Sequence, residues 1–173
     1  RATVNFYSAP SLKDKFPPNS ELLLDFLDPH YQYYPCEFEY DIGFLGNEYG
    51  VAAHRIDFLA GLEKHFKVLR GAATSLGEES AKLLSKCKLV ISIQDYHDQG
   101  FGIERRIYTF GNVRPIMVHY NEDYEAVGQP FTHYIPYGSL EEAIELIKDY
   151  NTDKVFKREE IGQNLKDKLK SEH

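Results

Sequence analysis

Long apolar runs and a secretory signal pattern are both absent from this sequence. No stretch approaches the roughly 20 apolar residues that a membrane-spanning helix needs. The chain opens on Arg1, without the charged and then apolar pattern of a signal peptide. We therefore expect no membrane span. Because the first residue is not methionine, we also expect a fragment, a processed product or a trimmed form of a longer protein.

Positive charge and cysteine are also scarce. Lys and Arg number 20 against 27 Asp and Glu, which gives a net charge of −7 and argues against a nucleic-acid partner. The only cysteines, Cys36 and Cys87, are far apart and form no CxxC spacing. A disulfide between the two cysteines remains an alternative, but we expect reduced cysteines in a cytoplasmic protein.

Several catalytic and cofactor motifs are missing. The seven histidines form no HExxH or HxH spacing, so no metal site is expected. There is no GxSxG for a nucleophilic serine, and no GxGxxG for a dinucleotide. We therefore expect neither a metal nor a resident cofactor.

The first 39 residues read as an irregular segment or interdomain linker. Pro10, Pro17 and Pro18 interrupt regular structure. Ser20 can cap a short helix that ends near Leu27. The tyrosine-rich stretch 30–40 has no amphipathic period, and we expect it to be a connector packed over the edge of a domain.

Residues 40–173 alternate between strand-like and helix-like patterns. The expected strands are Ile42–Leu45, Phe66–Leu69, Leu89–Ile93, Ile116–Val118 and Phe131–Ile135. Helical stripes lie between or after them at Ile56, Leu59 and Leu62; at Ala81, Leu84 and Cys87; at Leu140, Ala143, Ile144 and Ile147; and at Ile161, Leu165 and Leu169. Ser139 and Glu142 have the spacing of a capping box. The alternation predicts an α/β domain, a Rossmann-like parallel sheet with helices on both faces.

Ligands of such sheets bind beyond the carboxyl ends of the strands, where loop amides gather. Gly46 and Asn47 follow the first strand, Arg70 and Gly71 end the second, and His97 follows the third. We expect these residues to line a nucleotide-binding cleft. The alternative for Gly46 is a plain strand-to-helix turn, and the alternative for His97 is a solvated loop histidine.

The segment 100–109 carries the strongest signal for an anion. Two glycines precede a helix start at which Arg105 and Arg106 lie. Cations at a helix start oppose the helix dipole, unless an anion binds there. A guanidinium holds phosphate through paired hydrogen bonds, so we expect Arg106 to bind a phosphate group. The alternative is a surface ion pair with Glu104 or Asp98.

The segment 106–118, RIYTFGNVRPIMV, resembles a signature of GT-B glycosyltransferase C-terminal domains, R-x-F-E-A-x-A-x-G-x-x-x-V. CgeB-like enzymes of glycosyltransferase group 1 have this signature. Residues 41–46, DIGFLG, look like the D-x-x-F-x-G opening strand of that family, and 85–92, SKCKLVIS, are similar to its S-K-x-x-L-N-I segment. The resemblance covers about 130 of the 173 residues. It implies a Rossmann-like half of a GT-B fold that binds a nucleotide-sugar donor as its substrate.

The resemblance also assigns roles to single positions. Arg106 stands where the family arginine contacts the donor diphosphate. Thr109 stands where the family glutamate binds the ribose, and Arg114 replaces a family glycine. Thr109 offers one hydrogen bond where a carboxylate would grip two hydroxyls, so a weak ribose contact is expected.

A GT-B enzyme also needs an N-terminal acceptor domain, for which this chain is too short. The resemblance therefore implies a hexosyltransferase domain that is inactive without that partner. Two alternatives remain: a non-catalytic nucleotide-binding or protein-interaction module on the same scaffold, and an unrelated flavodoxin-like or Rossmann-like domain.

Overall fold

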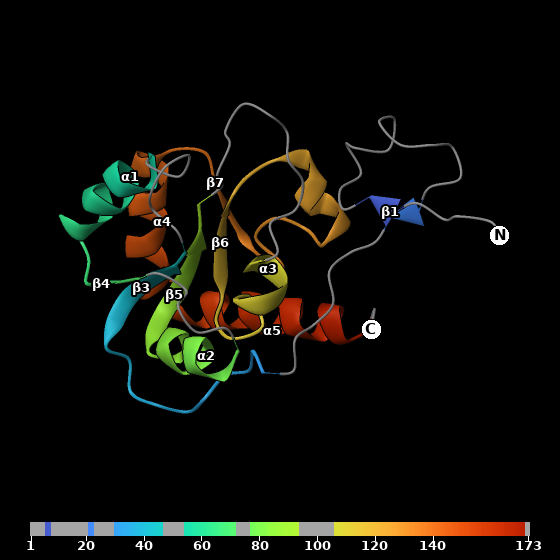
Figure 1. Ribbon diagram of the computed structural model, residues 1–173. Coiled ribbons are helices and arrows are strands. Elements are labelled where there is room, and N and C mark those ends of the chain that lie inside the picture. Colours follow the sequence, from blue (N-terminus) through green and yellow to red (C-terminus); the bar gives the residue numbers. More distant parts are fainter. Residues whose placement is uncertain are drawn as a thin grey trace.

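The structure is a computed structural model that describes residues 30–46, 54–71, 77–93 and 106–171, together with the backbone of Phe6–Tyr7 and Glu21–Leu22. Its centre is a five-stranded sheet in which all neighbouring strands are parallel (Figure 1). The strands are β3 (Tyr40–Leu45), β4 (Val68–Gly71), β5 (Cys87–Ser92), β6 (Ile116–His119) and β7 (Ile135–Tyr137). The predicted parallel α/β sheet is confirmed.

The strand order is β4-β3-β5-β6-β7. Along the chain, β4 is added on one side of β3, and β5 is then added on the other side of β3. The direction of growth thus reverses between β3 and β5, and in open parallel sheets ligands bind at the carboxyl end of such a reversal.

Helices cover both faces of the sheet, as predicted. They are α1 (His54–Glu63), α2 (Glu78–Ser85), α3 (Arg106–Thr109), the 3-10 helix η3 (Glu122–Ala126), α4 (Leu140–Asn151) and α5 (Val155–Ser171). Alternate residues of a strand face opposite sides of the sheet, so a strand can contribute side chains to the hydrophobic cores on both faces. On one face, Leu89 and Ile91 pack with α1 and α4, and on the other Val90 packs with α2 and α3.

The last helix joins the two cores. Ile161 is buried on the α1 and α4 side of the sheet, whereas Leu165 and Leu169 are buried on the α2 and α3 side. Between them Gly162 packs against Pro115, in the turn that enters β6. α5 therefore crosses the amino ends of the strands, below the sheet in Figure 1. The predicted narrow stripe of this helix is confirmed.

The connector 30–39 packs over this same edge, as predicted. Tyr31 is 4% exposed, its ring lies 5.9 Å from that of Phe110, and its carbonyl accepts a 2.6 Å hydrogen bond from Asn112. Further upstream, β1 (Phe6–Tyr7) and β2 (Glu21–Leu22) form a parallel pair. The helix predicted from Ser20 to Leu27 is therefore wrong at Glu21–Leu22, where strand pairing overrides a local capping signal.

Three local predictions also need correction. β7 begins at Ile135 rather than Phe131, because residues 131–133 form a hydrogen-bonded turn. Cys87 begins β5 instead of ending the stripe of α2. Ile56 is 36% exposed, and Arg55 is buried in its place with Leu59. The inward stripe of α1 thus begins one residue earlier than predicted, at a charged side chain.

The capping box of α4 is present in a shifted form. Ser139 Oγ accepts the amide hydrogen of Glu142, as predicted, at 3.2 Å. Glu142 Oε2 accepts from the amide of Gly138 at 2.8 Å, one residue before the cap. The cap thus fixes the exit of β7 as well as the start of α4.

Among the described residues, no helix has the length and apolar character needed to cross a membrane.

The two cysteines should differ sharply in reactivity. Cys36 is exposed and Cys87 is buried, and both are free. Burial raises the pKa of the Cys87 thiol to about 12, which leaves almost no reactive thiolate at pH 8. We expect iodoacetamide at pH 8 to modify Cys36 in the folded protein, and Cys87 only after unfolding in urea. Peptide mass spectrometry measures both, and modification of Cys87 without urea at the rate of Cys36 would contradict its burial.

Candidate functional site

Two predicted glycines meet at the carboxyl ends of β3 and β4. The amide of Gly46 donates a 2.9 Å hydrogen bond to the carbonyl of Gly71. A methyl group added at Gly71 would make only an ordinary 3.7 Å contact with Leu45. The protein itself therefore does not require a glycine at position 71.

Arg106 reaches the same edge from α3. Its Nε donates to the carbonyl of Leu45 at 3.4 Å, and its guanidinium lies 5.4 Å from the centre of the Phe44 ring. A methyl group on Gly46 would lie 2.5 Å from Arg106 Nη2. The glycine at position 46 therefore leaves room for the guanidinium where it lies, and any larger residue would force that guanidinium to shift. Residues 60 positions apart in the sequence thus form one arrangement at the reversal between β3 and β5.

The described part of the helix that carries Arg106 is the single turn α3, Arg106–Thr109. A single turn aligns few peptide dipoles, so the dipole of this described turn adds little to anion binding. The capacity to hold an anion lies in the guanidinium and its position.

A second arginine at this edge was missed by the sequence reasoning. Arg55, in α1, is 1% exposed and donates from Nε to the carbonyl of Ile93 at 2.8 Å. Its guanidinium also lies 5.4 Å from the Phe44 ring centre, the same distance as that of Arg106. The missed signal was the one used for Arg106, an arginine in the first turn of a helix. Together the two residues place two positive charges around Phe44.

The remaining described candidates are placed less decisively. Arg70 forms a 3.1 Å ion pair with Glu63, and the two side chains are 26% and 43% exposed. Thr109 lies in the same turn as Arg106 and is 7% exposed. A nearly buried hydroxyl presents little surface to a ligand. Asn47 and His97, together with Arg105 and the glycines at 100 and 102, lie outside the described residues.

Arg114 belongs to the opposite edge of the sheet. Its Nη2 donates to the carbonyl of Lys88 at 3.0 Å and to Glu159 at 2.8 Å. Its guanidinium lies 4.6 Å from the ring centre of Phe38 in the connector. The departure from the family glycine at this position therefore has a structural role at the amino ends of the strands, away from Arg106.

No protein-family model matches this sequence, and no curated protein matches it either. Solved structures do match it. One, described as the crystal structure of TarM, has a TM-score of 0.64 at 14% identity, over 96% of this chain and 39% of the other. A second, sucrose-phosphate synthase from Thermosynechococcus elongatus, also has a TM-score of 0.64, at 12% identity, over 99% of this chain and 54% of the other.

At these identities the likeness concerns the fold alone, and the chain spans 39% and 54% of the two matched structures. Both neighbours have the GT-B glycosyltransferase fold. Taken with the five parallel strands and the helices on both faces, the comparison shows that this chain has a Rossmann-like α/β fold of the kind found in GT-B glycosyltransferases.

Proposed function

We propose that this chain is the donor-binding part of a glycosyltransferase that transfers a sugar from a nucleotide-sugar. The observation that carries the proposal is the contact of Arg106 with Gly46 at the reversal between β3 and β5. The glycine makes room for a guanidinium at the point where open parallel sheets bind nucleotides.

The chemistry of sugar transfer suits this arrangement. When the glycosidic bond to the donor breaks, negative charge develops on the departing nucleoside diphosphate. A guanidinium already held in place stabilises that charge without reorganising during the reaction. Arg106 would bind the diphosphate directly, and Arg55, which is almost fully buried, would add positive potential behind it.

The proposed function divides the chain into two parts. Residues 40–173 would be the donor domain, and residues 1–39 would lead from an acceptor domain that precedes it. Because the two matched structures are about twice as long or longer, we propose that such a domain completes the active site and that this chain alone transfers no sugar. The two free cysteines support a reducing, cytoplasmic location.

One observation favours a second candidate, a non-catalytic nucleotide-binding or protein-interaction module. Thr109 is 7% exposed and occupies the position of the family glutamate. A neutral and nearly buried side chain cannot grip ribose as a carboxylate does. Such a module would bind nucleoside diphosphates weakly and transfer no sugar even when joined to an acceptor domain.

Thermal unfolding tests the proposed ligand class. We expect at least one of uridine, guanosine, adenosine and thymidine diphosphates to raise the unfolding temperature. A ligand at 100 times its dissociation constant stabilises the folded state by about 2.7 kcal/mol, or roughly 5–10 °C for a chain of this size. The matching nucleosides, which lack the diphosphate, serve as controls. Equal shifts from nucleosides and diphosphates, or no shift from any of them, would contradict diphosphate recognition.

A further inference from the structure

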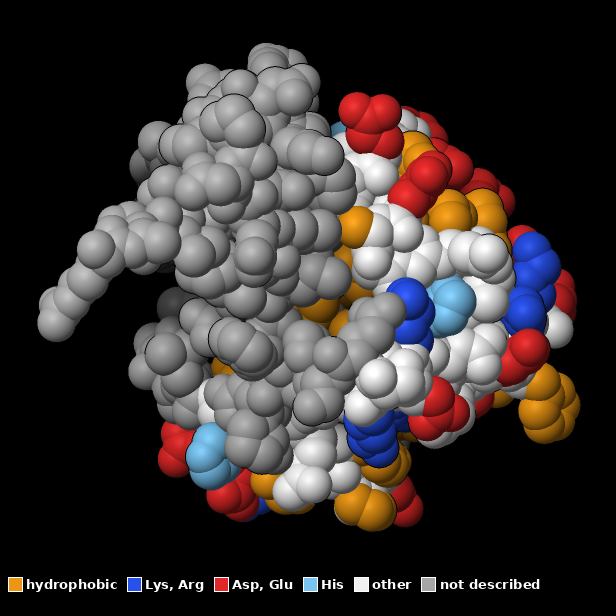
Figure 2. Space-filling model, turned by 90° about the vertical axis from the view of Figure 1, so that its right-hand side faces the viewer, with side chains coloured by type: hydrophobic (Ala, Val, Ile, Leu, Met, Phe, Trp, Pro, Cys, Tyr) orange, Lys and Arg blue, Asp and Glu red, His pale blue; other side chains and the backbone are white. Residues whose placement is uncertain are grey.

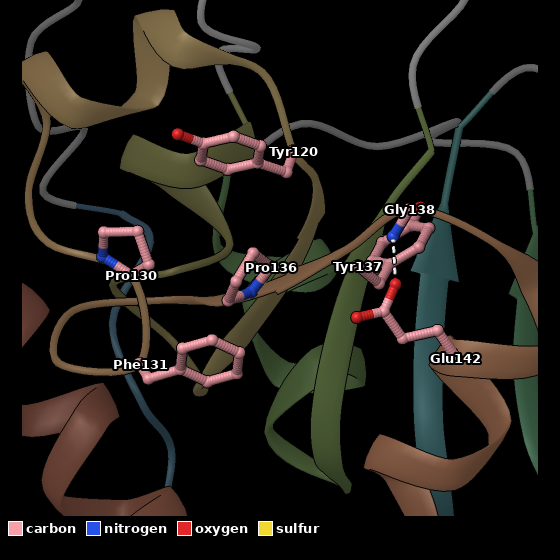
Figure 3. Close-up of a pocket in the computed structure, with 7 residues that line it drawn as sticks. All are labelled: Tyr120, Pro130, Phe131, Pro136, Tyr137, Gly138 and Glu142. Atoms are coloured by element: carbon pink, nitrogen blue, oxygen red, sulfur yellow. Dashed lines mark hydrogen bonds between the residues drawn. The ribbon is translucent and has the colours of Figure 1, made fainter.

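An apolar pocket of about 380 Å³ lies at the outer edge of β7, apart from the arginines. Its lining residues are Tyr120, Pro130, Phe131, Pro136, Tyr137, Gly138 and Glu142 (Figure 3). They come from the end of β6, the turn before β7, β7 itself and the start of α4. The volume falls in the range of small-molecule sites, roughly 300–1,000 Å³.

Two aromatic side chains dominate the pocket. Tyr120 is 39% exposed and Phe131 is 45% exposed, and Figure 3 shows their rings on either side of Pro136. Exposed rings of this kind offer a flat apolar face to a ligand while one side remains open to water. The pocket therefore suits a ligand with one apolar face and one hydrated face.

Phe131 holds its position at a conformational cost. Its φ angle is 57°, in the left-handed region that side chains other than glycine rarely adopt. The turn keeps it there: the Phe131 amide donates to the Tyr134 carbonyl at 2.8 Å, and Asn164 of α5 donates to the Thr132 carbonyl at 3.1 Å. Glycine would relieve this backbone strain, and a strained position of this kind favours a functional role for the side chain.

The edge of the sheet at this pocket does not suit an added peptide strand. The carbonyl of Tyr137 accepts from the Tyr120 amide, toward β6. Backbone groups alternate in direction along a strand, so Pro136 faces outward. Proline has no amide hydrogen to offer there, which removes a donor that an incoming strand would need. A small ligand fits this edge better than an extended peptide.

The charge around the pocket restricts the ligand further. Glu142 uses Oε2 for the Gly138 amide, and Figure 3 shows its other oxygen turned toward the pocket. Tyr120 donates its hydroxyl to Glu125 of η3 at 2.8 Å. These carboxylates disfavour an anionic ligand and accept hydrogen bonds from hydroxyl or amino groups.

We propose that this pocket binds the pyranose ring of a neutral or amino sugar, stacked against Phe131 and Tyr120 with a hydroxyl or amino group donated to Glu142. The proposed saccharide binding does not depend on the proposed glycosyltransferase function. This pocket, bordered by carboxylates, and the cationic diphosphate site would hold ligands of different charge.

Binding of simple saccharides tests the proposal. Methyl glucoside, methyl galactoside, methyl mannoside, glucosamine and glucuronic acid are titrated at pH 8 and followed by saturation-transfer NMR and calorimetry. We expect dissociation constants of about 1–10 mM for the best neutral or amino sugar, which corresponds to roughly −4 to −3 kcal/mol. Glucuronic acid should bind at least tenfold more weakly.

Three variants separate the pocket from general effects. Phe131→Gly and Tyr120→Ala should weaken saccharide binding at least tenfold, and Phe131→Gly should still unfold within about 2 °C of wild type because it relieves the backbone. Phe156→Ala removes an aromatic ring that is 93% exposed on α5 and should leave binding unchanged.

Absence of binding by every saccharide, or equal binding by all variants, would overturn the proposal. Binding of tetramethylammonium in place of sugars would overturn it in favour of a cation site. The nucleoside diphosphate that gives the largest thermal shift is titrated into the same samples, so that loss of the donor site and loss of this pocket are measured separately.

Discussion

Arg106→Ala is expected to weaken nucleoside diphosphate binding by ten- to more than a hundredfold. A guanidinium meets a diphosphate through paired, charge-assisted hydrogen bonds, and loss of such a contact costs about 1.5–3 kcal/mol. Titration calorimetry with the diphosphate that gives the largest thermal shift measures the effect. Arg106→Lys should fall between wild type and alanine, because it keeps the charge but loses the paired geometry.

Two further variants show whether the effect is local. Lys157→Ala removes one positive charge from α5, where Lys157 pairs with Glu160 at 3.2 Å, and should leave the affinity within twofold. Arg70→Ala should have a smaller effect than Arg106→Ala, because Glu63 already engages Arg70. Equal affinities of the wild type and of Arg106→Ala would show that Arg106 does not bind the diphosphate.

Glu159→Gln is expected to lower the free energy of unfolding by about 2 kcal/mol. Glu159 Oε1 accepts from Arg114 and Arg158 at 2.8 Å each, and those side chains are 5% and 3% exposed. Burial lowers the pKa of Arg158, which shows how strongly its charge needs a partner. Removal of one partner from a fully buried ion pair costs about 3–5 kcal/mol, and the 45% exposure of Glu159 reduces that cost.

The neighbouring residue supplies the matched control. Glu160 pairs with Lys157 at the surface, where both side chains are about half exposed. Figure 2 shows charged side chains of both signs interspersed on one described face, the setting in which single ion pairs contribute little. Glu160→Gln should change stability by no more than about 0.5 kcal/mol. Urea unfolding measures both variants, and equal effects would mean that the two buried guanidiniums do not depend on Glu159.

The parallel sheet could be predicted because its pattern is local and repeated. Each strand is a short apolar run such as that from Leu89 to Ile91, and several are separated from the next by a segment with helical spacing. The errors arose where a tertiary contact decides the outcome. Phe131 is of a residue type common in strands, but it lies in a turn at a positive φ angle, and Asn164 of α5 donates a hydrogen bond to the Thr132 carbonyl of that turn.

The candidate site was predictable in part for a related reason. Gly46 and Arg106 each follow a strand in the chain, and the topology of a parallel sheet brings such segments to one edge. Arg55 was missed because an apolar reading of α1 favoured Ile56 for the inward position, and a buried arginine breaks that pattern. The near-complete burial of Thr109 could not be predicted from the residues beside it in the sequence. It depends on how α3 packs against β3 and β5.

The path of α5 has a consequence for synthesis of the protein. Every strand precedes this helix in the chain, yet Ile161, Leu165 and Leu169 complete the cores on both faces. On the ribosome the nascent sheet therefore emerges with its amino edge still open on two sides. Until α5 leaves the exit tunnel, we expect apolar surface to be available to chaperones and to other nascent chains, and we expect the docking of this one helix to cover both cores.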